Sequence, residues 1–181
     1  MSDLQSSLPL GAPHHCAYVV DDIDATVERL VAGVGAGPFF LIEEVPLEDV
    51  RSGGEAAEFV HNSAFGMCGD GVVELMQPIR LAPDRVEAAF APPRPRIQHI
   101  AYVVAPAEVA GVRAALDARG LPEYLSSRFG GVETTLHDAS PILGHDLEIH
   151  VDNDGLHGFF GMVRDGAQGW DGSQPLRLVE I

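Results

Sequence analysis

Lysine is absent from this 181-residue sequence, so all 11 basic residues are arginines, against 27 aspartates and glutamates. Without lysine, the chain cannot form a Schiff base with a substrate or supply a phosphate-loop lysine. The formal net charge of -16 repels polyanions, and no arginine-rich stripe offsets it. We therefore expect no nucleic-acid partner.

Cysteine and long apolar runs are also scarce. The two cysteines, Cys16 and Cys68, lie in apolar stretches without the spacing of a metal or redox motif, so we interpret them as small buried side chains. No stretch approaches the roughly 18 apolar residues of a membrane span, and the first twelve residues lack the basic and apolar regions of a signal peptide. With 46% hydrophobic and 21% charged residues, the composition is that of a folded globule. We expect a cytoplasmic protein with no membrane partner.

A repeat divides the sequence into two similar halves. Residues 15–20 read HCAYVV and residues 99–104 read HIAYVV, and both segments have the β-branched and aromatic residues of strands. A helix is predicted after each copy, over residues 25–34 in the first half and from Ala105-Pro106 to Gly120 in the second. Three strand-like segments follow each helix, at residues 39–45, 56–65 and 71–76 and at residues 124–129, 132–137 and 146–151.

The sequence therefore predicts an α+β fold built from two tandem βαβββ modules. The predicted parts are an N-terminal extension (1–12), a first module (13–89), a proline-rich linker (90–96), a second module (97–152) and a C-terminal helix and tail (153–181). Apolar side chains at helical spacing predict a helix from about residue 156 to 168. This helix could pack on the sheet or on a second subunit, and we expect a homodimer.

A histidine and a glutamate recur at matching places in the two halves. His15 and His99 begin the first strand of each half, and Glu74 and Glu148 stand in the middle of each last strand. An ionised carboxylate between apolar neighbours is costly unless it is solvated, paired or bound to a cation. A pseudo-twofold relation would bring two imidazoles and two carboxylates to one point, a donor set suited to one divalent ion per site, whether Zn, Ni, Co, Mn or Fe. Duplication that kept the residues without the metal is the competing explanation.

Two further histidines lie beside these candidates. His14 would point to the strand face opposite to His15, and its counterpart in the second half is Gln98, so we set it aside as a ligand. His150 shares the strand face of Glu148 and could support that residue or replace it as a ligand.

Other side chains could form a pocket around the predicted metal. His61 and His137 occupy similar places in the two halves and could line a cavity as acid or base, although surface positions fit them as well. An apolar wall could come from aromatic residues, of which the candidates are Phe39, Phe40, Phe65 and Phe129.

The doubled pattern of strand, helix and three strands, with these histidines and glutamates on the first and last strands, resembles the vicinal oxygen chelate (glyoxalase, bleomycin resistance and dioxygenase) superfamily. The resemblance covers about residues 13–152, and the segment GAGPFF at residues 35–40 is similar to the glyoxalase- or methylmalonyl-CoA-epimerase-like branch. It implies a curved, cup-like mixed sheet with helices outside and His15, Glu74, His99 and Glu148 as metal ligands. It also implies removal of a proton next to a metal-bound carbonyl, with Glu148 as the base and Glu74 as the symmetric alternative.

Three functions are compatible with this pattern. The first is a divalent-metal-dependent epimerase, isomerase or lyase that acts on a small organic or thioester substrate. The second is an extradiol-type ring-cleaving dioxygenase, whose iron site uses two histidines and one carboxylate, so the additional carboxylate at Glu74 argues against it. The third is a non-catalytic, resistance-type protein that binds a small molecule. Because the arginines are scattered, we expect no dedicated site for an anionic thiol carrier.

Overall fold

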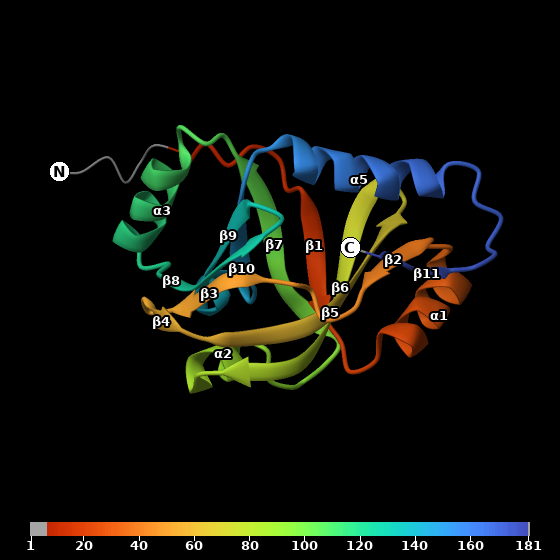
Figure 1. The fold of residues 1–181 in the computed structure, drawn as a ribbon, viewed down its shortest axis with the longest axis horizontal. Coiled ribbons are helices and arrows are strands. Elements are labelled where there is room, and N and C mark those ends of the chain that lie inside the picture. The colour runs from red at the N-terminus through yellow and green to blue at the C-terminus, as the bar shows by residue number, and fades with distance from the viewer. Residues whose placement is uncertain (1–6, 181) are drawn as a thin grey trace.

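Strands β1 (His15–Val19) and β7 (Arg96–Val104) pair in antiparallel orientation at the centre of a mixed sheet (Figure 1). The computed structural model describes residues 7–180, and within them the sheet has eleven strands. Each central strand also has a parallel neighbour, which is β6 (Gly71–Ala82) for β1 and β10 (Asp146–Val151) for β7. Beyond these the order is again equivalent, with β5 (Glu58–Cys68) and β2 (Phe39–Ile42) on one side and β9 (Val132–His137) and β8 (Glu123–Phe129) on the other. The predicted α+β fold with two βαβββ repeats is confirmed.

One helix from each half covers the outer face of the sheet. Helix α1 (Ile23–Val34) buries Val27 against Leu75 of β6, and α3 (Val109–Ala118) buries Leu116 against Ile149 of β10. The Asp22 side chain accepts a hydrogen bond from the Ala25 backbone N–H (2.9 Å) and so caps the start of α1. These contacts leave the concave face of the curved sheet free for the candidate site.

Three strands lie outside the repeated pattern and were not predicted. Strand β3 (Glu48–Ser52) leaves the first half to pair with β8 of the second half and with the short β4 (Glu55–Ala56). Strand β11 (Leu176–Leu178), in the C-terminal tail, adds to the opposite edge of the sheet beside β2. The predicted strand at residues 39–45 was also too long, because β2 ends at Ile42 before the chain turns towards β3. The two halves are thus joined by a shared sheet edge as well as by the central β1–β7 pair.

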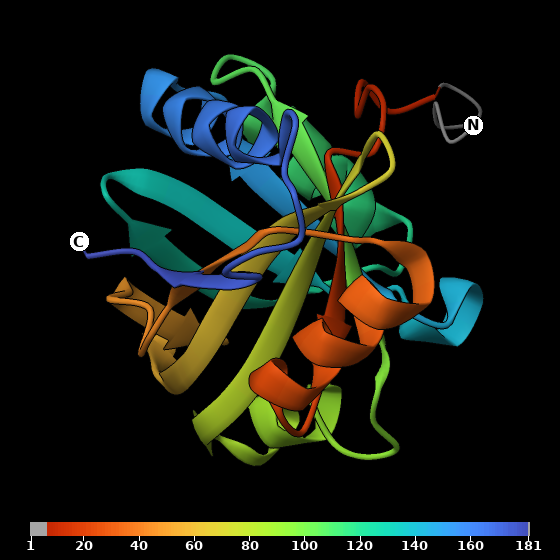
Figure 2. The same ribbon diagram turned by 90° about the vertical axis from the view of Figure 1, so that its right-hand side faces the viewer.

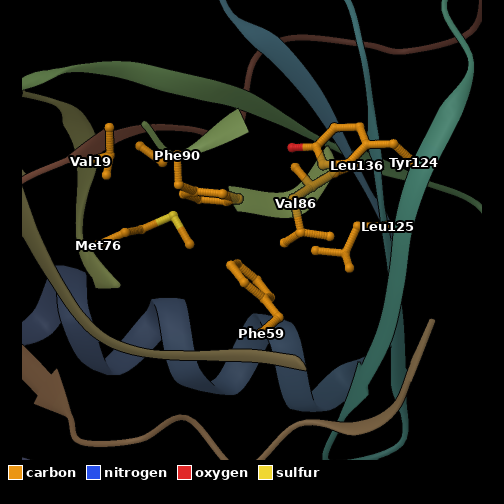
Figure 3. Close-up of a cluster of buried hydrophobic side chains, with 9 residues drawn as sticks. Val19, Phe59, Met76, Val86, Phe90, Tyr124, Leu125 and Leu136 are labelled. Carbon is orange, nitrogen blue, oxygen red and sulfur yellow. The ribbon is translucent and has the colours of Figure 1, made fainter. Parts of the chain in front are cut away.

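A hydrophobic cluster packs side chains from the two halves together (Figure 3). Helix α2 (Asp84–Ala89), which the sequence did not predict, places Val86 there, and the buried Phe90 follows from the segment predicted as a linker. Their neighbours come from both halves: Met76 from β6 packs in the same cluster as Leu125 from β8. The start of the proline-rich segment is therefore part of the core.

Helix α5 (Asp154–Ala167) lies across the sheet on the side opposite to α1 (Figures 1 and 2). It corresponds to the helix predicted at 156–168, and it begins two residues earlier because the Asn153 side chain accepts a hydrogen bond from the Leu156 N–H (3.0 Å). A short helix, α4 (Ser140–Leu143), precedes β10. None of the helices within residues 7–180 combines the length and apolar character needed to cross a bilayer.

Part of the predicted N-terminal extension contacts the fold. Residues 1–6 lie outside the described part of the chain, whereas Leu8 and Leu10 pack against the cluster that surrounds α3. Leu8 and Leu10 of the predicted extension (1–12) therefore make apolar contacts with the second half.

Phe39 lies in the core between β2 and α1, so its assignment to a pocket wall was wrong. Its side chain is fully buried among residues packed on α1, because strand alternation turns it away from the concave face. Its ring lies over Gly66, the residue paired with it on β5, and a Cβ atom at Gly66 would stand 2.7 Å from the ring.

Replacing Gly66 by alanine is expected to lower the free energy of unfolding by about 1–3 kcal/mol, since the enclosed ring has little room to move. Gly158→Ala in α5 is the control, because a Cβ there meets nothing within 4 Å and alanine favours a helix by up to about 1 kcal/mol. Urea unfolding curves measure both changes, and equal stability of the two variants would contradict the packing described.

Candidate metal centre

The pairing register brings the two repeated histidines and two repeated glutamates onto one sheet face. Ala17 of β1 is paired with Glu74 on one side and His99 on the other, while Ala101 of β7 is paired with His15 and Glu148. Residues in one such row project from the same face of a sheet. The two alanines are fully buried, and their small side chains leave space above the sheet in which the four longer ones meet.

Four potential ligand atoms from these side chains lie within 4.8 Å of one another. The imidazole Nε2 of His15 is 3.2 Å from Glu74 Oε2, and the Nε2 of His99 is 3.0 Å from Glu148 Oε2. The two crossed histidine–glutamate distances are both 3.5 Å. All four residues are buried. The structure thus brings together the four residues that the sequence singled out as ligands.

His15 Nε2 and Glu74 Oε2 form a hydrogen bond (3.2 Å), but the directions of the other atoms fit a shared cation better than mutual hydrogen bonds. Among the described residues, His99 Nε2, Glu148 Oε2 and His150 Nε2 are buried without a hydrogen-bond partner. The His150 Nε2 atom is only 2.8 Å from Glu148 Oε2, so the geometry rather than the distance fails. Unsatisfied buried polar atoms are rare, and a divalent ion accepts several nitrogen and oxygen lone pairs at one point. Two imidazoles and two carboxylates therefore fit a divalent metal.

The electrostatics of the cluster keep both carboxyl groups ionised. Burial alone would lower the pKa of His99, but Glu148 and Glu74 outweigh it and raise that pKa to about 10. Burial likewise opposes ionisation of Glu74, yet His15 and His99 hold the pKa of its carboxyl well below the usual range. The pKa of Glu148 is lowered too, against burial, chiefly by His150 and His99. Both carboxylates are thus in the state that a metal requires, whereas His99 would release a proton when a metal binds.

Hydrogen bonds behind the cluster hold two of its members. The Ser63 hydroxyl donates to Glu74 Oε1 (2.6 Å), which leaves the other oxygen of that carboxylate facing the histidines. Behind His99, the Nδ1 atom lies 2.6 Å from Gln98 Oε1. Gln98 in turn donates from its Nε2 to Asp146 Oδ2 (2.8 Å). Outer contacts of this kind orient the ligands of metal sites.

His14 contacts His15, so the prediction that it points to the opposite strand face was wrong, although it does not belong to the four-residue cluster. Its Nδ1 lies 3.0 Å from His15 Nδ1, and its ring packs edge-on against Phe160 at 4.4 Å between centroids. Because β1 begins at His15, strand alternation does not apply to His14. Burial and the neighbouring His15 lower the pKa of His14 to about 4, so it is uncharged near neutral pH.

A cavity of about 220 Å³ extends from the cluster into the concave side of the sheet. Its lining includes His15, Glu74 and Glu148. Four further pocket candidates also line it, namely His61, Phe65, Phe129 and His150. The pKa of the buried His61 is lowered by desolvation, and its ring stacks on Phe59 at 4.2 Å between centroids.

Two other pocket candidates do not line the cavity. His137 is fully buried, with its Nδ1 3.2 Å from the Leu121 carbonyl oxygen and its Nε2 3.1 Å from Thr135 Oγ1, so it serves the packing of the second half. Phe40 packs against the end of α5, where a Cβ at Gly166 would stand 2.5 Å from its ring. These two predictions failed because strand position alone does not tell which side chains neighbouring elements cover.

The sequence matches the family model of the Glyoxalase/Bleomycin resistance protein/Dioxygenase superfamily over residues 14–134. The chain belongs to this superfamily. The match contains three of the four clustered residues and ends before Glu148 and α5. The predicted superfamily is confirmed.

Solved structures share the superfamily fold at low sequence identity. Methylmalonyl-CoA epimerase from Mycobacterium tuberculosis is 16% identical, with a TM-score of 0.53 over 84% of this chain and 95% of that one. A hypothetical protein from Bacillus halodurans is 17% identical, with a TM-score of 0.53 over 79% of this chain and 95% of that one. No curated protein matches the sequence. At these identities the similarity shows the fold alone.

Several residues of this superfamily member escaped sequence reasoning. Ser63 and Gln98 are neutral residues that no local motif distinguishes from surface side chains, and their roles depend on strands that pair far along the chain. The C-terminal helix was predicted to pack either on the sheet or on a second subunit. The structure shows that Leu156 and Phe159 of this helix line the cavity. Only the repeat itself could have suggested Gln98, since it precedes His99 as His14 precedes His15.

Proposed function

We propose that this protein is a divalent-metal-dependent enzyme of the epimerase, isomerase or lyase type, which removes a proton next to a carbonyl group of a small substrate. The observation that carries the proposal is the convergence of four nitrogen and oxygen donors within 4.8 Å, from residues of which three line a cavity. His15, Glu74, His99 and Glu148 would hold the ion. When bound, it would polarise the substrate carbonyl and stabilise the negative charge that develops as the proton leaves.

Glu148 is the base in this proposal. Its Oε2 has no hydrogen-bond partner among the described residues and its side chain lines the cavity, whereas Glu74 is fixed by the hydroxyl of Ser63. A less restrained carboxylate can turn to a substrate C–H bond more easily. His150, 2.8 Å from Glu148 Oε2, lies where it can stabilise the carboxylate or exchange a proton with it. When configuration is inverted, Glu74 would first take up a proton from solvent and deliver it to the opposite face of the substrate carbon, and Glu148 would release the proton it removed to solvent.

Exchange of a substrate α-proton with heavy water tests this proposal. A chiral 2-phenylpropanoyl thioester supplies one exchangeable proton and an optical centre, so deuterium uptake and racemisation can be followed together. We expect exchange with metal-loaded protein, and a decrease of about 100-fold or more in Glu148→Gln, in line with the usual contribution of a general base.

Two controls make the result decisive. Glu58→Gln changes an exposed carboxylate on β5 and should leave exchange unchanged. Metal content of Glu148→Gln, measured in parallel, separates loss of the base from loss of the ion. Undiminished exchange in a metal-loaded Glu148→Gln variant would refute the base, and absence of metal binding in the native protein would refute the proposal as a whole.

The other two functions predict different experimental results. An extradiol dioxygenase would consume oxygen with a catechol and iron, and the second carboxylate, Glu74, makes this less compatible with the donor set. A binding protein would be stabilised by an apolar ligand without exchanging its protons. The homodimer and the cytoplasmic location stay predictions from the sequence.

A further inference from the structure

Helix α5 builds a wall of the cavity that lies beyond the superfamily match. Gly155, Leu156, Phe159 and Phe160 line the cavity from this helix. The helix is held beside the predicted ligands, because the Phe160 ring stacks on the His15 ring with 5.4 Å between centroids and 26° between planes. The wall is therefore tied to the predicted ligands themselves, and it is positioned to select what reaches them.

Much of the remaining cavity wall is also apolar. Side chains from the first half and from the β8–β9 hairpin face α5, and they include Ile42, Val45, Leu47, Phe129 and Val132. A dry apolar cavity of about 150 Å³ is enough for benzene. A cavity of about 220 Å³ with such walls can therefore enclose an aromatic ring or a branched chain with a substituent.

No fixed cation in the lining could neutralise an anionic substrate group. The chain has no lysine, and no arginine is among the described residues that line the cavity. The carboxylates of Glu74 and Glu148 are the acidic groups present there. An anionic group placed beyond reach of the metal would be desolvated without a partner, and the ion would offer it little attraction because these two carboxylates already balance the ion's charge, so its burial is strongly unfavourable.

Neutral hydrogen-bonding groups in the cavity are few. Ser63 is bonded to Glu74, and the Thr134 hydroxyl lies 2.8 Å from His150 Nδ1. His61 holds its Nδ1 3.4 Å from the Phe59 carbonyl oxygen, which leaves its Nε2 available for a substrate. The Ser127 hydroxyl also lines the cavity, so His61 and Ser127 are the side chains that can meet a small uncharged polar group in addition to the end bound at the metal.

We propose that the site selects a carbonyl compound whose enclosed part, beyond the oxygens that reach the metal, is uncharged and mainly apolar, such as an aromatic or branched acyl group packed against α5. This inference rests on the proposed function. Any charged carrier attached to the substrate stays outside the cavity, since the lining offers it no partner.

Hydroxamic acids test the proposal because they chelate a divalent ion through two oxygens and carry a variable side group. Calorimetric titration of Zn-loaded protein would compare benzohydroxamic acid with acetohydroxamic acid and with 4-carboxybenzohydroxamic acid. We expect benzohydroxamic acid to bind at least about tenfold more tightly than either, since burial of a phenyl group is favourable and burial of an unpaired carboxylate is not. Equal or tighter binding of the carboxylated compound, or of the methyl compound, would overturn the proposal.

A pair of variants in α5 locates the selectivity. Phe159→Arg places a cation in the cavity wall at a half-buried position and should reduce the preference against the 4-carboxyl group at least about tenfold. Met162→Arg is the matched control, since it adds the same charge one turn along α5 at a position that is 37% exposed and outside the cavity lining. An equal effect of the two variants would mean that overall charge, not the wall, sets the preference, and would contradict the proposal.

A metal-free measurement separates this inference from the proposed function. Thermal shifts with acetophenone and 4-carboxyacetophenone report the preference of the walls without any ion. If the native protein binds no metal but still prefers acetophenone, the proposed function fails and the apolar selectivity stands. If metal binds and the carboxylated compounds are preferred, the selectivity fails and the proposed function stands.

Discussion

Replacing His15 and His99 together by glutamine is expected to weaken the binding of divalent ions by more than about 100-fold. Loss of a partner that merely orients a ligand already costs about 10–100-fold, and two of the four donors themselves are removed here. Glutamine keeps a polar side chain of similar length, so the carboxylates of Glu74 and Glu148 still have a hydrogen-bond donor nearby. The effect should therefore appear in metal affinity rather than in loss of the fold.

Calorimetry with Zn and metal analysis of the purified protein measure this change directly. Thermal unfolding gives a second readout, because an ion at 100 times its dissociation constant stabilises the native state by about 2.7 kcal/mol. That stabilisation should be present in the native protein and absent in the double variant. His145→Gln combined with His157→Gln is the control, since both residues lie outside the cluster. Metal binding that survives in the double variant would show that the ion sits elsewhere.

The four donors could be predicted because the repeat fixes both the strand and the face on which each one lies. Since His15 and His99 hold matching positions on the equivalent strands β1 and β7, a shift of one residue in the register of either half would turn its donors to the helix-covered face. The central β1–β7 pair then places the two halves around one point. The sequence similarity between the halves was thus sufficient to predict which four side chains meet.

Residues without a repeated counterpart were harder to place. Phe39 and Phe40 are neighbours on one short strand, and only the positions of α1 and α5 decide that both are covered by helices. Strand β3, with the sequence EDVRS, has few of the residues that favour strands, and it forms by pairing with β8 from the other half. Such pairing depends on tertiary context, which local patterns do not contain.

The hydrogen-bond chain behind His99 depends on similarly distant contacts. Gln98 contacts Tyr124, 26 residues away, and Asp146, 48 residues away, so no local motif could have indicated the chain. Both the Gln98 amide and the Tyr124 hydroxyl donate to the same oxygen, Oδ2 of Asp146, at 2.8 Å. The amide nitrogen of Gln98 is thereby directed to Asp146, and its oxygen is directed to His99.

This chain determines which nitrogen of His99 is free for a metal. Since Gln98 Oε1 can only accept, the proton of the hydrogen bond must be on His99 Nδ1, and Nε2 of a neutral imidazole then presents its lone pair to the cluster. Gln98 is thus a positioning residue that acts through His99. Nothing in this role requires Gln98 to touch a substrate, and it does not line the cavity.

Gln98→Leu should weaken metal binding by about 10–100-fold, because the ring of His99 loses both its orientation and its preferred tautomer. A Co-loaded protein makes the change visible, as the absorption bands of the ion depend on ligand geometry and would shift in the variant. Tyr124→Phe is the matched comparison: it removes one donor to Asp146 but leaves the bond from Gln98 to Asp146, so metal affinity should change by less than in Gln98→Leu. If Gln98 served packing alone, Gln98→Leu would lower the stability of the metal-free protein but leave the Co spectrum and the metal affinity unchanged. That outcome would contradict the positioning role.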